Sequence, residues 1–395
     1  MSLAILGNPP AFSEPLHVGC PNIGDRRRLI ARINAALDRR WLTNGGPLVE
    51  EFEAAVAAVA GASECVVTSN GTAALELAIR ALGMSGRVIV PSFTFSATIH
   101  ALTWQRIEPV FADIDPLTLN IAPAEVERLM TPEVTGIIGV HLWGRGCDVE
   151  SLSAIANEHR IPLLFDAAHA FGCSYHQRPI GSFGDAEIFS FHGTKFINSF
   201  EGGAIVTDSY ELAERLRLMR NFGFAGYDDV IHAGTNGKMN EAEAAMGLTN
   251  LESMSVFIDR NRSNHDLYSQ LINTIPGLNV LTYDPSEHQN YQYVVVDVQP
   301  EVCGLSRDQL LQVLFSENVL ARRYFYPGAH RMTAFREFAP VRPLPVTESF
   351  CSRLLLLPTG MAIDDAAVQS VCEIIRIAIE RAPEVVSQIR SSPQL

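Results

Sequence analysis

The stretch AEIFSFHGTKFINSFEGGAIVT, residues 186–207, contains one of only two lysines in a chain of 395 residues. Residues 186–191 and 203–206 are short apolar runs, which predicts two buried strands. Lys195 then lies on the loop between the strands, beside His192, where a fully solvated charge is poorly placed. A lysine in such a position can form a Schiff base with a carbonyl group. The alternative is an ordinary surface lysine on a turn.

Composition narrows the class of protein. The chain is 47% hydrophobic and 19% charged, and it is long enough for two domains. Its net charge of −14 argues against a nucleic acid or an anionic membrane surface as the main partner. The seven cysteines include no CxxC pair, which fits reduced thiols in a cytoplasm. We expect a cytoplasmic globular protein with no signal peptide, membrane span or metal site.

On the N-terminal side of Lys195, short apolar runs alternate with helical patterns. The predicted strands are residues 65–68, 88–90, 109–111, 136–140 and 161–165. The predicted helices between and before them are residues 26–40, 48–60, 73–82, 96–104, 124–130 and 149–159. Short, uniformly apolar strands separated by helices predict a mostly parallel sheet that is covered on both faces.

On the C-terminal side the pattern changes. A helix over residues 210–220 and a glycine-rich loop over 223–237 precede one long predicted helix, about 240–272, that would bridge to a second region. A strand near residue 290 and helices over 307–316 and 364–379 follow. We therefore expect a large α/β domain with an N-terminal helical arm over residues 1–250, and a smaller α+β domain over residues 251–395.

The segment TSNGTA, residues 68–73, follows a predicted strand and opens a predicted helix. In that position the amides of Gly71, Thr72 and Ala73 point toward an anion, and the helix dipole favours negative charge. Ser190, on the strand that leads to Lys195, could add a hydroxyl group. We predict a phosphate site, with an ordinary helix N-cap as the alternative.

Asp166 ends an apolar strand with no basic residue beside it in sequence, and a buried carboxylate is costly unless it meets a cation. A protonated pyridine nitrogen is such a cation, and its proton makes the ring of pyridoxal phosphate an electron sink. His169, on the same face of a helix, could bind the ring's phenolic oxygen. Phe95 could stack on the ring, and Phe93 is the rival for this role. Each residue also fits an ordinary role as a cap or core residue, but their joint order favours pyridoxal phosphate.

The sequence resembles the DegT/DnrJ/EryC1/StrS family of sugar aminotransferases, which have the aspartate aminotransferase-like architecture called fold type I. The resemblance covers nearly the whole chain. The stretches that match include VIVPSFTFSAT (88–98), and the most specific are TSNGTAALELA (68–78), LLFDAAHAFG (163–172) and FSFHGTKFINSFEGGAIVT (189–207) in this order. This resemblance implies a mostly parallel, seven-stranded sheet flanked by helices, with a smaller α+β domain after it.

The resemblance also implies roles for single residues. Lys195 would be the Schiff-base lysine and proton shuttle, Asp166 the partner of the pyridinium nitrogen, and His169 the neighbour of the phenolic oxygen. The residues that would bind the phosphate or stack on the ring are Gly71, Thr72, Ser190 and Phe95. Because one branch of the family replaces the lysine with histidine and dehydrates its substrate, the lysine here indicates transamination.

Asn236 would reach the phosphate of the neighbouring subunit's cofactor, which implies a homodimer with shared active sites. Two departures from the family pattern bear on these expectations. Gly193 stands where several members have proline before the Thr-Lys pair. The run Asn236-Gly237-Lys238 stands where others have Asn-Tyr-Arg, so the role of Lys238 is open.

For the substrates, the resemblance implies glutamate or glutamine as amino donor and a nucleotide-linked ketosugar as acceptor, most often a dTDP-4-keto-6-deoxyhexose. Residues 322–332 could form a loop at the active site, with arginines for the diphosphate and Tyr326 or His330 near the sugar. His192 is a further candidate. A 3-keto sugar or a ketoinositol is the nearest alternative acceptor. A regulatory protein that binds pyridoxal phosphate without turnover is a remote one, disfavoured by the acidic charge and the intact Lys195.

Overall fold

Seven strands form the central sheet of the computed structural model, which describes residues 2–391. The strand order is β2-β10-β9-β6-β5-β3-β4. In that order the bounds are Glu64–Thr68, Gly203–Thr207, Ala186–Ser190, Leu163–Asp166, Val134–Val140, Arg87–Pro91 and Glu108–Ala112. Strand β10 is antiparallel to both of its neighbours, and all other pairs are parallel. The prediction of a mostly parallel sheet is confirmed.

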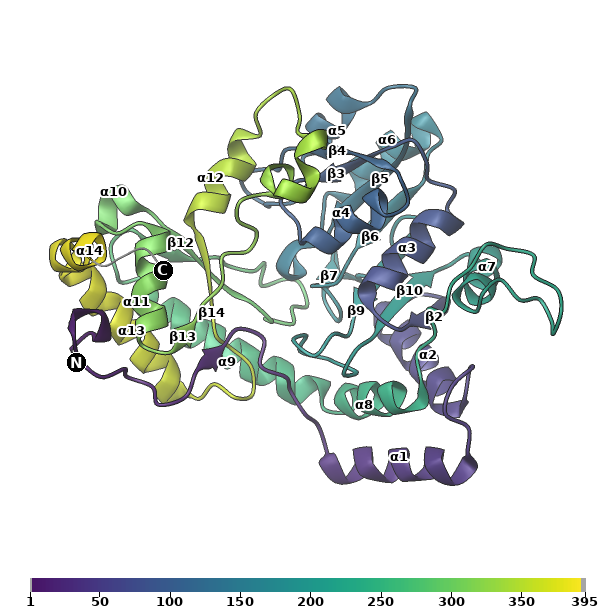
Figure 1. Cartoon of the computed structure of the whole chain (residues 1–395), viewed down its shortest axis with the longest axis horizontal. Helices are drawn as coiled ribbons and strands as arrows, with labels where there is room; N and C mark the ends of the chain where they lie inside the picture. Colours follow the sequence, from purple (N-terminus) through teal and green to yellow (C-terminus); the bar gives the residue numbers. More distant parts are fainter. Residues whose placement is uncertain (1, 392–395) are drawn as a thin grey trace.

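Both faces of this sheet are covered because neighbouring residues of each strand point to opposite sides. In β6, for example, Phe165 and Leu164 belong to two different cores. On the side of Phe165 the sheet packs against α2 (Pro47–Ala60), α5 (Pro123–Leu129) and α6 (Val149–His159). Helix α8 (Glu241–Leu251) packs against α2 in the same core, and α1 (Arg26–Arg39) lies outside α8 (Figure 1). The opposite side packs against α3 (Gly71–Ala81), α4 (Ser96–Thr103) and α7 (Tyr210–Arg220).

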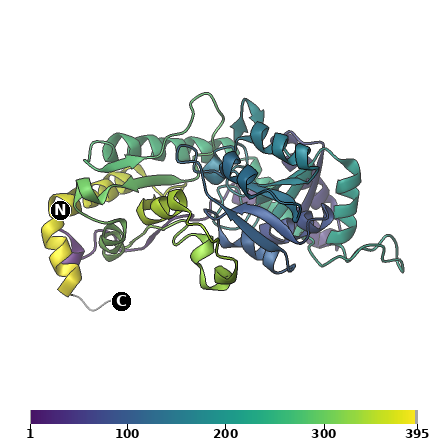
Figure 2. The same ribbon diagram turned by 90° about the horizontal axis from the view of Figure 1, so that it is seen from above.

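A second, smaller region follows in the chain. Its antiparallel sheet has the order β11-β12-β14, with bounds Leu278–Val280, Val294–Val298 and Leu354–Leu357. Its helices are α10 (Pro300–Cys303), α11 (Arg307–Ser316), α12 (Pro345–Arg353), α13 (Asp365–Glu380) and α14 (Ala382–Ser391). Figure 2 shows this region at one end of an elongated molecule, while a long loop after α7 projects at the other end.

The connection between the regions differs from the single long helix that the sequence predicts. Helix α8 ends at Leu251, and a separate helix, α9, covers Met254–Ile272. At the break, Glu252 pairs with Arg28 and Arg32 of α1. Helix α9 begins in the core of the large sheet and ends in the core of the small one, so it still bridges the two regions.

The N-terminal segment lies with the C-terminal region. Leu3 is buried in the small core, and the short helix η1 (Ala4–Leu6) packs against it. Strand β1 (Leu16–His17) pairs in parallel with β13 (Val319–Leu320). The division of the chain at residue 250 stays a prediction. Residues 3–17 precede this boundary in sequence but pack with the small region that follows it. No helix within residues 2–391 is long and apolar enough to cross a lipid bilayer.

Candidate active site

One cavity, of about 260 Å³, lies where the carboxyl ends of β2, β6 and β9 meet. We call it the lysine cavity. Because the carboxyl ends of parallel strands share an edge, segments far apart in sequence converge there. Eight of the predicted site residues line it: Gly71, Thr72, Phe95, Asp166, His169, Ser190, His192 and Lys195.

Lys195 lies on the loop after β9, and its backbone N–H donates to the carbonyl of His192 at 2.8 Å. Its side-chain nitrogen, Nζ, lies 3.3 Å from the phenol oxygen of Tyr293. Burial lowers the pKa of the Lys195 amine to about 8, and the charge of Asp166 acts in the opposite direction. An amine with such a pKa is neutral in a larger fraction of molecules near physiological pH than an ordinary lysine is, and the neutral form can act as nucleophile or base.

Asp166 is the last residue of β6 and is 5% exposed. Its Oδ2 accepts a hydrogen bond from the Thr98 hydroxyl (2.8 Å), and its Oδ1 accepts one from the N–H of Ala168 (3.1 Å). Burial raises the pKa of this carboxyl, and these bonds and Lys195 partly oppose the rise. Within residues 2–391 no lysine or arginine forms an ion pair with Asp166. A cationic ring nitrogen is the kind of partner that this carboxylate lacks.

His169 lies on a turn after β6, so the helix that the sequence predicts here is absent. Its ring packs against Tyr293, with centroids 4.7 Å apart, and is parallel to the ring of Phe325. Burial lowers the pKa of His169 well below its usual value, so the ring is neutral. Its Nδ1 accepts the N–H of Trp143 at 3.5 Å, which leaves the ring proton on Nε2 as a donor for a phenolic oxygen.

The predicted phosphate site lies at the start of α3. Asn70 caps this helix, and its side chain accepts the N–H of Ala73 at 2.8 Å. The Ala73 amide is therefore occupied, contrary to our prediction. In the described part of the chain the amides of Gly71 and Thr72 donate to no protein acceptor. A Cβ on Gly71 would lie 3.0 Å from the Cβ of Ser190, so a larger residue would force Ser190 to shift. Two free amides and two hydroxyls thus form a cradle that fits a phosphate.

The structure distinguishes between the two candidate aromatic residues. Phe95 precedes α4, lines the lysine cavity and is 52% exposed. Phe93 is 1% exposed and packs edge-on against Trp143 and Phe325, with ring centroids 5.7 Å apart in both cases. Phe95 is therefore the aromatic residue available to a bound ring, and Phe93 belongs to the core.

Two other predicted residues lie elsewhere. Asn236 is exposed on the loop after α7 and does not line the lysine cavity. Tyr326 lines a neighbouring cavity of about 400 Å³, which shares Phe95 and Tyr324 with the lysine cavity. The ring of Tyr326 lies 4.5 Å from the guanidinium carbon of Arg323. Any role of Asn236 thus depends on a second subunit, and any role of Tyr326 on a ligand that reaches the second cavity.

His330 does not face either cavity, so the expectation that it lies near the sugar is not met. It is 6% exposed. Its Nδ1 lies 2.6 Å from the Ser92 hydroxyl, and its Nε2 lies 3.3 Å from Glu348. These two partners hold the ring inside the fold, which the local sequence could not reveal.

Lys238, whose role the sequence left open, has structural partners. Its amine donates to Asn221 at 2.8 Å and lies 4.7 Å from the ring centroid of Phe222. The residue therefore fastens the two ends of the projecting loop after α7 to each other. It does not line the lysine cavity.

Sequence reasoning missed several residues of the cavity. Thr98 binds Asp166, Glu201 lies 3.4 Å from His192, and Tyr293 and Tyr324 enter from the small region. Thr98 stands in the stretch 88–98 that carried the family resemblance, so a signal for it existed. Tyr324 stands in the run 322–332 that the sequence analysis places at the active site, but nothing in the sequence around residue 293 indicates that Tyr293 meets Lys195, because its position depends on how the two regions pack.

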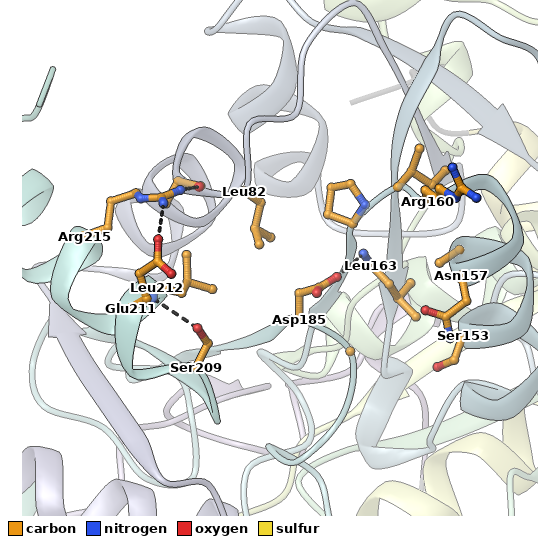
Figure 3. A pocket seen from close by; sticks show the side chains of 15 residues that line it. Leu82, Ser153, Asn157, Arg160, Leu163, Asp185, Ser209, Glu211, Leu212 and Arg215 are labelled. Atoms are coloured by element: carbon orange, nitrogen blue, oxygen red, sulfur yellow. Dashed lines mark hydrogen bonds and ion pairs between the residues drawn. The ribbon is translucent and has the colours of Figure 1, made fainter.

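A third, more open cavity, of about 670 Å³, lies at the amino ends of β6 and β9, and we call it the amino-end cavity (Figure 3). Two of its charged side chains, Asp185 and Arg215, have partners within the protein. Asp185 accepts the N–H of Leu163 at 2.8 Å. Arg215 donates to the carbonyl of Ala81 at 2.9 Å and pairs with Glu211 at 3.2 Å. No lysine or histidine of residues 2–391 lines this cavity, and Arg215 links α7 to the end of α3 while Asp185 links the start of β9 to β6.

Comparisons with known proteins agree with this geometry. The model of the DegT/DnrJ/EryC1/StrS aminotransferase family matches residues 24–376. A dTDP-4-amino-4,6-dideoxy-D-glucose transaminase of Shigella dysenteriae is 35% identical over 366 residues, which are 92% of this chain and 99% of that protein. A GDP-perosamine synthase of Escherichia coli O157:H7 is 31% identical over 345 residues, which are 86% of this chain and 93% of that protein.

Among solved structures, DesI, crystallised in the presence of its TDP-sugar product, superposes with a TM-score of 0.95 at 48% identity, over 98% of this chain and 99% of that one. The match to the family model, the fold and the residues of the lysine cavity all indicate the same family and the same cofactor. The chain therefore belongs to the DegT/DnrJ/EryC1/StrS aminotransferase family and is a fold-type I transaminase that uses pyridoxal phosphate.

Proposed function

We propose that the protein transfers an amino group from glutamate or glutamine to a nucleotide-linked 4-ketosugar and so forms an amino-deoxysugar. The observation that carries this proposal is the Lys195 amine, which shares one cavity with the cation-free carboxylate of Asp166 and the free amides of Gly71 and Thr72. A dTDP-4-keto-6-deoxyhexose is the favoured acceptor. Identity is higher to DesI, which was crystallised in the presence of its TDP-sugar product (48%), than to the GDP-perosamine synthase (31%).

The cradle residues fit the cofactor group by group. Gly71, Thr72 and Ser190 would hold the phosphate, His169 the phenolic oxygen, and Phe95 one face of the ring. Bound there, the cofactor supplies an electron-withdrawing ring that acidifies the C–H bond next to the donor's nitrogen. Asp166, kept anionic by Thr98 and the Ala168 amide, would hold a proton at the ring nitrogen.

Lys195 would carry the moving proton. Its pKa of about 8 means that a useful fraction of the amine is neutral near physiological pH. In that form it accepts the proton from the donor carbon, and as ammonium it returns the proton to another carbon. His192 and Glu201, at the rim of the cavity, are 3.4 Å apart and could bind sugar hydroxyls together.

The second cavity offers room for the nucleotide. It is lined by Arg322, Arg323 and Tyr326, and it meets the lysine cavity at Phe95 and Tyr324. Guanidinium groups suit a diphosphate because they donate paired hydrogen bonds and stay charged. We therefore propose that the sugar occupies the lysine cavity while the diphosphate and base extend toward Tyr326.

We also propose a cytoplasmic homodimer. The loop after α7 projects from the body of the protein (Figure 2) and exposes apolar side chains, with Tyr227 101% and Val230 56% exposed. Helix α1 likewise exposes Ile30 and Leu37. Large apolar side chains exposed on these two elements favour a subunit contact there. In such a dimer, Asn236 of one chain would reach the phosphate cradle of the other. The free cysteines fit a reducing compartment.

The decisive experiment separates the two half-reactions. The purified protein, loaded with pyridoxal phosphate, is treated with glutamate or glutamine, and the visible absorbance should shift toward that of the pyridoxamine form. A panel of 4-keto sugars linked to dTDP or GDP, 3-keto sugars and a ketoinositol is then added. We expect the dTDP-4-keto-6-deoxyhexose to restore the original spectrum fastest. Restoration by a 3-keto sugar or the ketoinositol alone would refute the proposed acceptor, and no response to any donor would refute turnover.

The dimer has its own test. Sedimentation should give twice the mass of one chain. Mixing inactive Asn236→Ala and Lys195→Ala variants should restore part of the activity, since a hybrid dimer contains one intact site. A monomer, or no recovery on mixing, would argue against shared sites.

A further inference from the structure

We propose that Tyr293 is a further catalytic residue, whose phenol positions the free amine of Lys195 for proton transfer by a hydrogen bond between the two regions of the protein. This inference rests on the transaminase activity of the family and does not depend on which ketosugar is the acceptor. Among the described residues, Tyr293 is the only one whose side chain hydrogen bonds to the Lys195 amine.

The contact is made by the hydroxyl group. The Lys195 nitrogen lies 3.3 Å from the Tyr293 oxygen but 6.0 Å from the centroid of its ring. Tyr293 immediately precedes β12 of the small sheet, whereas Lys195 follows β9 of the large sheet. The bond therefore joins a reacting atom of one region to a side chain that the other region holds.

Several contacts fix Tyr293 in this place. The Tyr283 hydroxyl donates to the backbone carbonyl of Tyr293 at 3.0 Å, and the ring of His169 packs against its ring. The residue before it, Gln292, accepts the N–H of Phe196 at 3.4 Å. Two successive residues of the small region thus bind two successive residues of the lysine loop. A side chain held in this way is pre-organised for its partner.

The chemistry of the phenol defines its role. Burial raises the pKa of Tyr293 well above its usual value, so the hydroxyl stays protonated and is not itself a base. It can donate to the lone pair of the neutral amine, and it can accept from the ammonium. Tyr293 thus holds the Lys195 nitrogen in both protonation states, while the proton that is transferred moves on and off Lys195 alone.

Removing the hydroxyl should change the amine in a defined direction. Hydrogen bonds to a charged group are stronger than those to a neutral one, so loss of the acceptor destabilises the ammonium more than the amine. The pKa of Lys195 should therefore fall below its value of about 8. The other ionisable groups around this pair are Asp166, His169, Tyr283, Tyr324, His192 and Glu201. None of them is altered by Tyr293→Phe.

The chain allows a direct measurement because it has only two lysines, Lys195 and Lys238. The full chain, labelled with ¹³C,¹⁵N-lysine and freed of cofactor, should give two side-chain signals, and Lys238→Arg assigns them. We expect the Lys195 signal of Tyr293→Phe to titrate about 0.5–1 pH unit below that of the unmodified protein. The Lys238 signal should not shift, since Lys238 is bonded to Asn221.

The loaded enzyme gives a second readout. In stopped-flow experiments with the amino donor, Tyr293→Phe should slow the donor half-reaction about tenfold or more, change KM for the donor little, and move the acidic limb of the rate profile to lower pH. Tyr291→Phe is the matched control. Tyr291 packs against His265 and Tyr283 and does not line the cavity. Loss of its hydroxyl group should therefore leave both the Lys195 titration and the rate of the donor half-reaction unchanged.

An unchanged Lys195 titration in folded Tyr293→Phe would overturn the proposal, even if activity fell, because the residue would then be merely structural. An unchanged half-reaction would overturn it as well. Neither measurement uses a ketosugar, so failure of the proposed acceptor would leave this test intact.

Discussion

The lysine cavity and the amino-end cavity lie at opposite ends of one sheet and differ in a way that volume does not reveal. The amino-end cavity is larger, about 670 Å³ against about 260 Å³, and its charged side chains Asp185 and Arg215 have partners within the protein. In the lysine cavity, Asp166 lacks a cation, and the amides of Gly71 and Thr72 lack acceptors in the described chain. Incomplete hydrogen bonding at a buried place, more than size, therefore identifies the functional cavity.

One helix shows why the two ends differ. Helix α3 begins at the lysine cavity with Gly71 and ends at the amino-end cavity with Ala81. Its free amides, the positive end of the helix dipole, face the lysine cavity. At the other end, the carbonyl of Ala81 accepts a hydrogen bond from Arg215. The protein thus places a cationic side chain at the carboxyl end of α3 and leaves the amides at its amino end open for an anion.

The largest expected effect of any substitution is that of Lys195→Ala. Without the amine, the protein lacks both the nucleophile and the proton carrier, so transamination should fall by about 10⁴-fold or more. The absorbance of the lysine-linked cofactor should disappear in the same sample. Full activity in this variant would contradict the conclusion that the lysine cavity is the functional one of the two.

Asp166→Asn should be the next most harmful change. The neutral amide cannot hold a proton on the ring nitrogen, so the donor half-reaction should slow by about 10²-fold or more while the cofactor stays bound. Stopped-flow rates and a cofactor-binding titration would separate these quantities. If the rate stayed at its normal value, the only role of Asp166 would be to stabilise the turn after β6 through its hydrogen bond to Ala168.

Thr98→Val should have a smaller effect through Asp166. The hydroxyl stabilises the anionic carboxylate, so its loss should raise the pKa of Asp166 further, by about 1 pH unit. Because the anionic form is the active one, the acidic limb of the rate profile should move to higher pH. Thr103→Val, at the exposed end of α4, is the control. Coinciding profiles for the two variants would show that Thr98 is dispensable.

Lys195→Met should make the cofactor-free protein more stable, by roughly 3 kcal/mol at pH 7. The folded state disfavours the ammonium, as the lowered pKa of about 8 records. The gain should be complete below pH 8 and should vanish as pH rises toward the lysine's ordinary pKa of 10.5. Urea unfolding at several pH values measures it, and a loss of stability at pH 7 would contradict the assigned burial.

Arg215→Ala should have the smallest effect. Its ion pair with Glu211 is exposed on the surface of α7, so its removal should cost about 1 kcal/mol or less. Transamination should be unchanged, which makes this variant the counterpart of Lys195→Ala at the other end of the sheet. A large loss of activity would show that the amino-end cavity takes part in function.

The sequence predicts the lysine cavity well because its residues follow apolar strands, and the carboxyl ends of parallel strands must meet. Chain direction and hydrophobic pattern alone bring Gly71, Asp166 and Lys195 together. Tyr293 could not be predicted in this way, because its position depends on the packing of two regions.

The predictions that were wrong depend on single contacts. His330 is drawn inward by Ser92 and Glu348, and the Ala73 amide is taken by the Asn70 side chain. The long predicted helix breaks beside Glu252, which pairs with α1. Periodicity reports which face of an element is apolar, but it does not report which side chain reaches a given donor.

The pairing of β1 with β13 has a consequence for the order of folding. Leu16 meets Val319, so these partners are separated by most of the chain. During synthesis, residues 3–17 are made long before the last helices, yet their place in the small core exists only after those helices have formed. The large sheet can assemble early, while the region that supplies Tyr293 must wait until residues 3–17 and the last helices have met. A newly made chain should therefore build its cofactor cradle before it can position the lysine that works there.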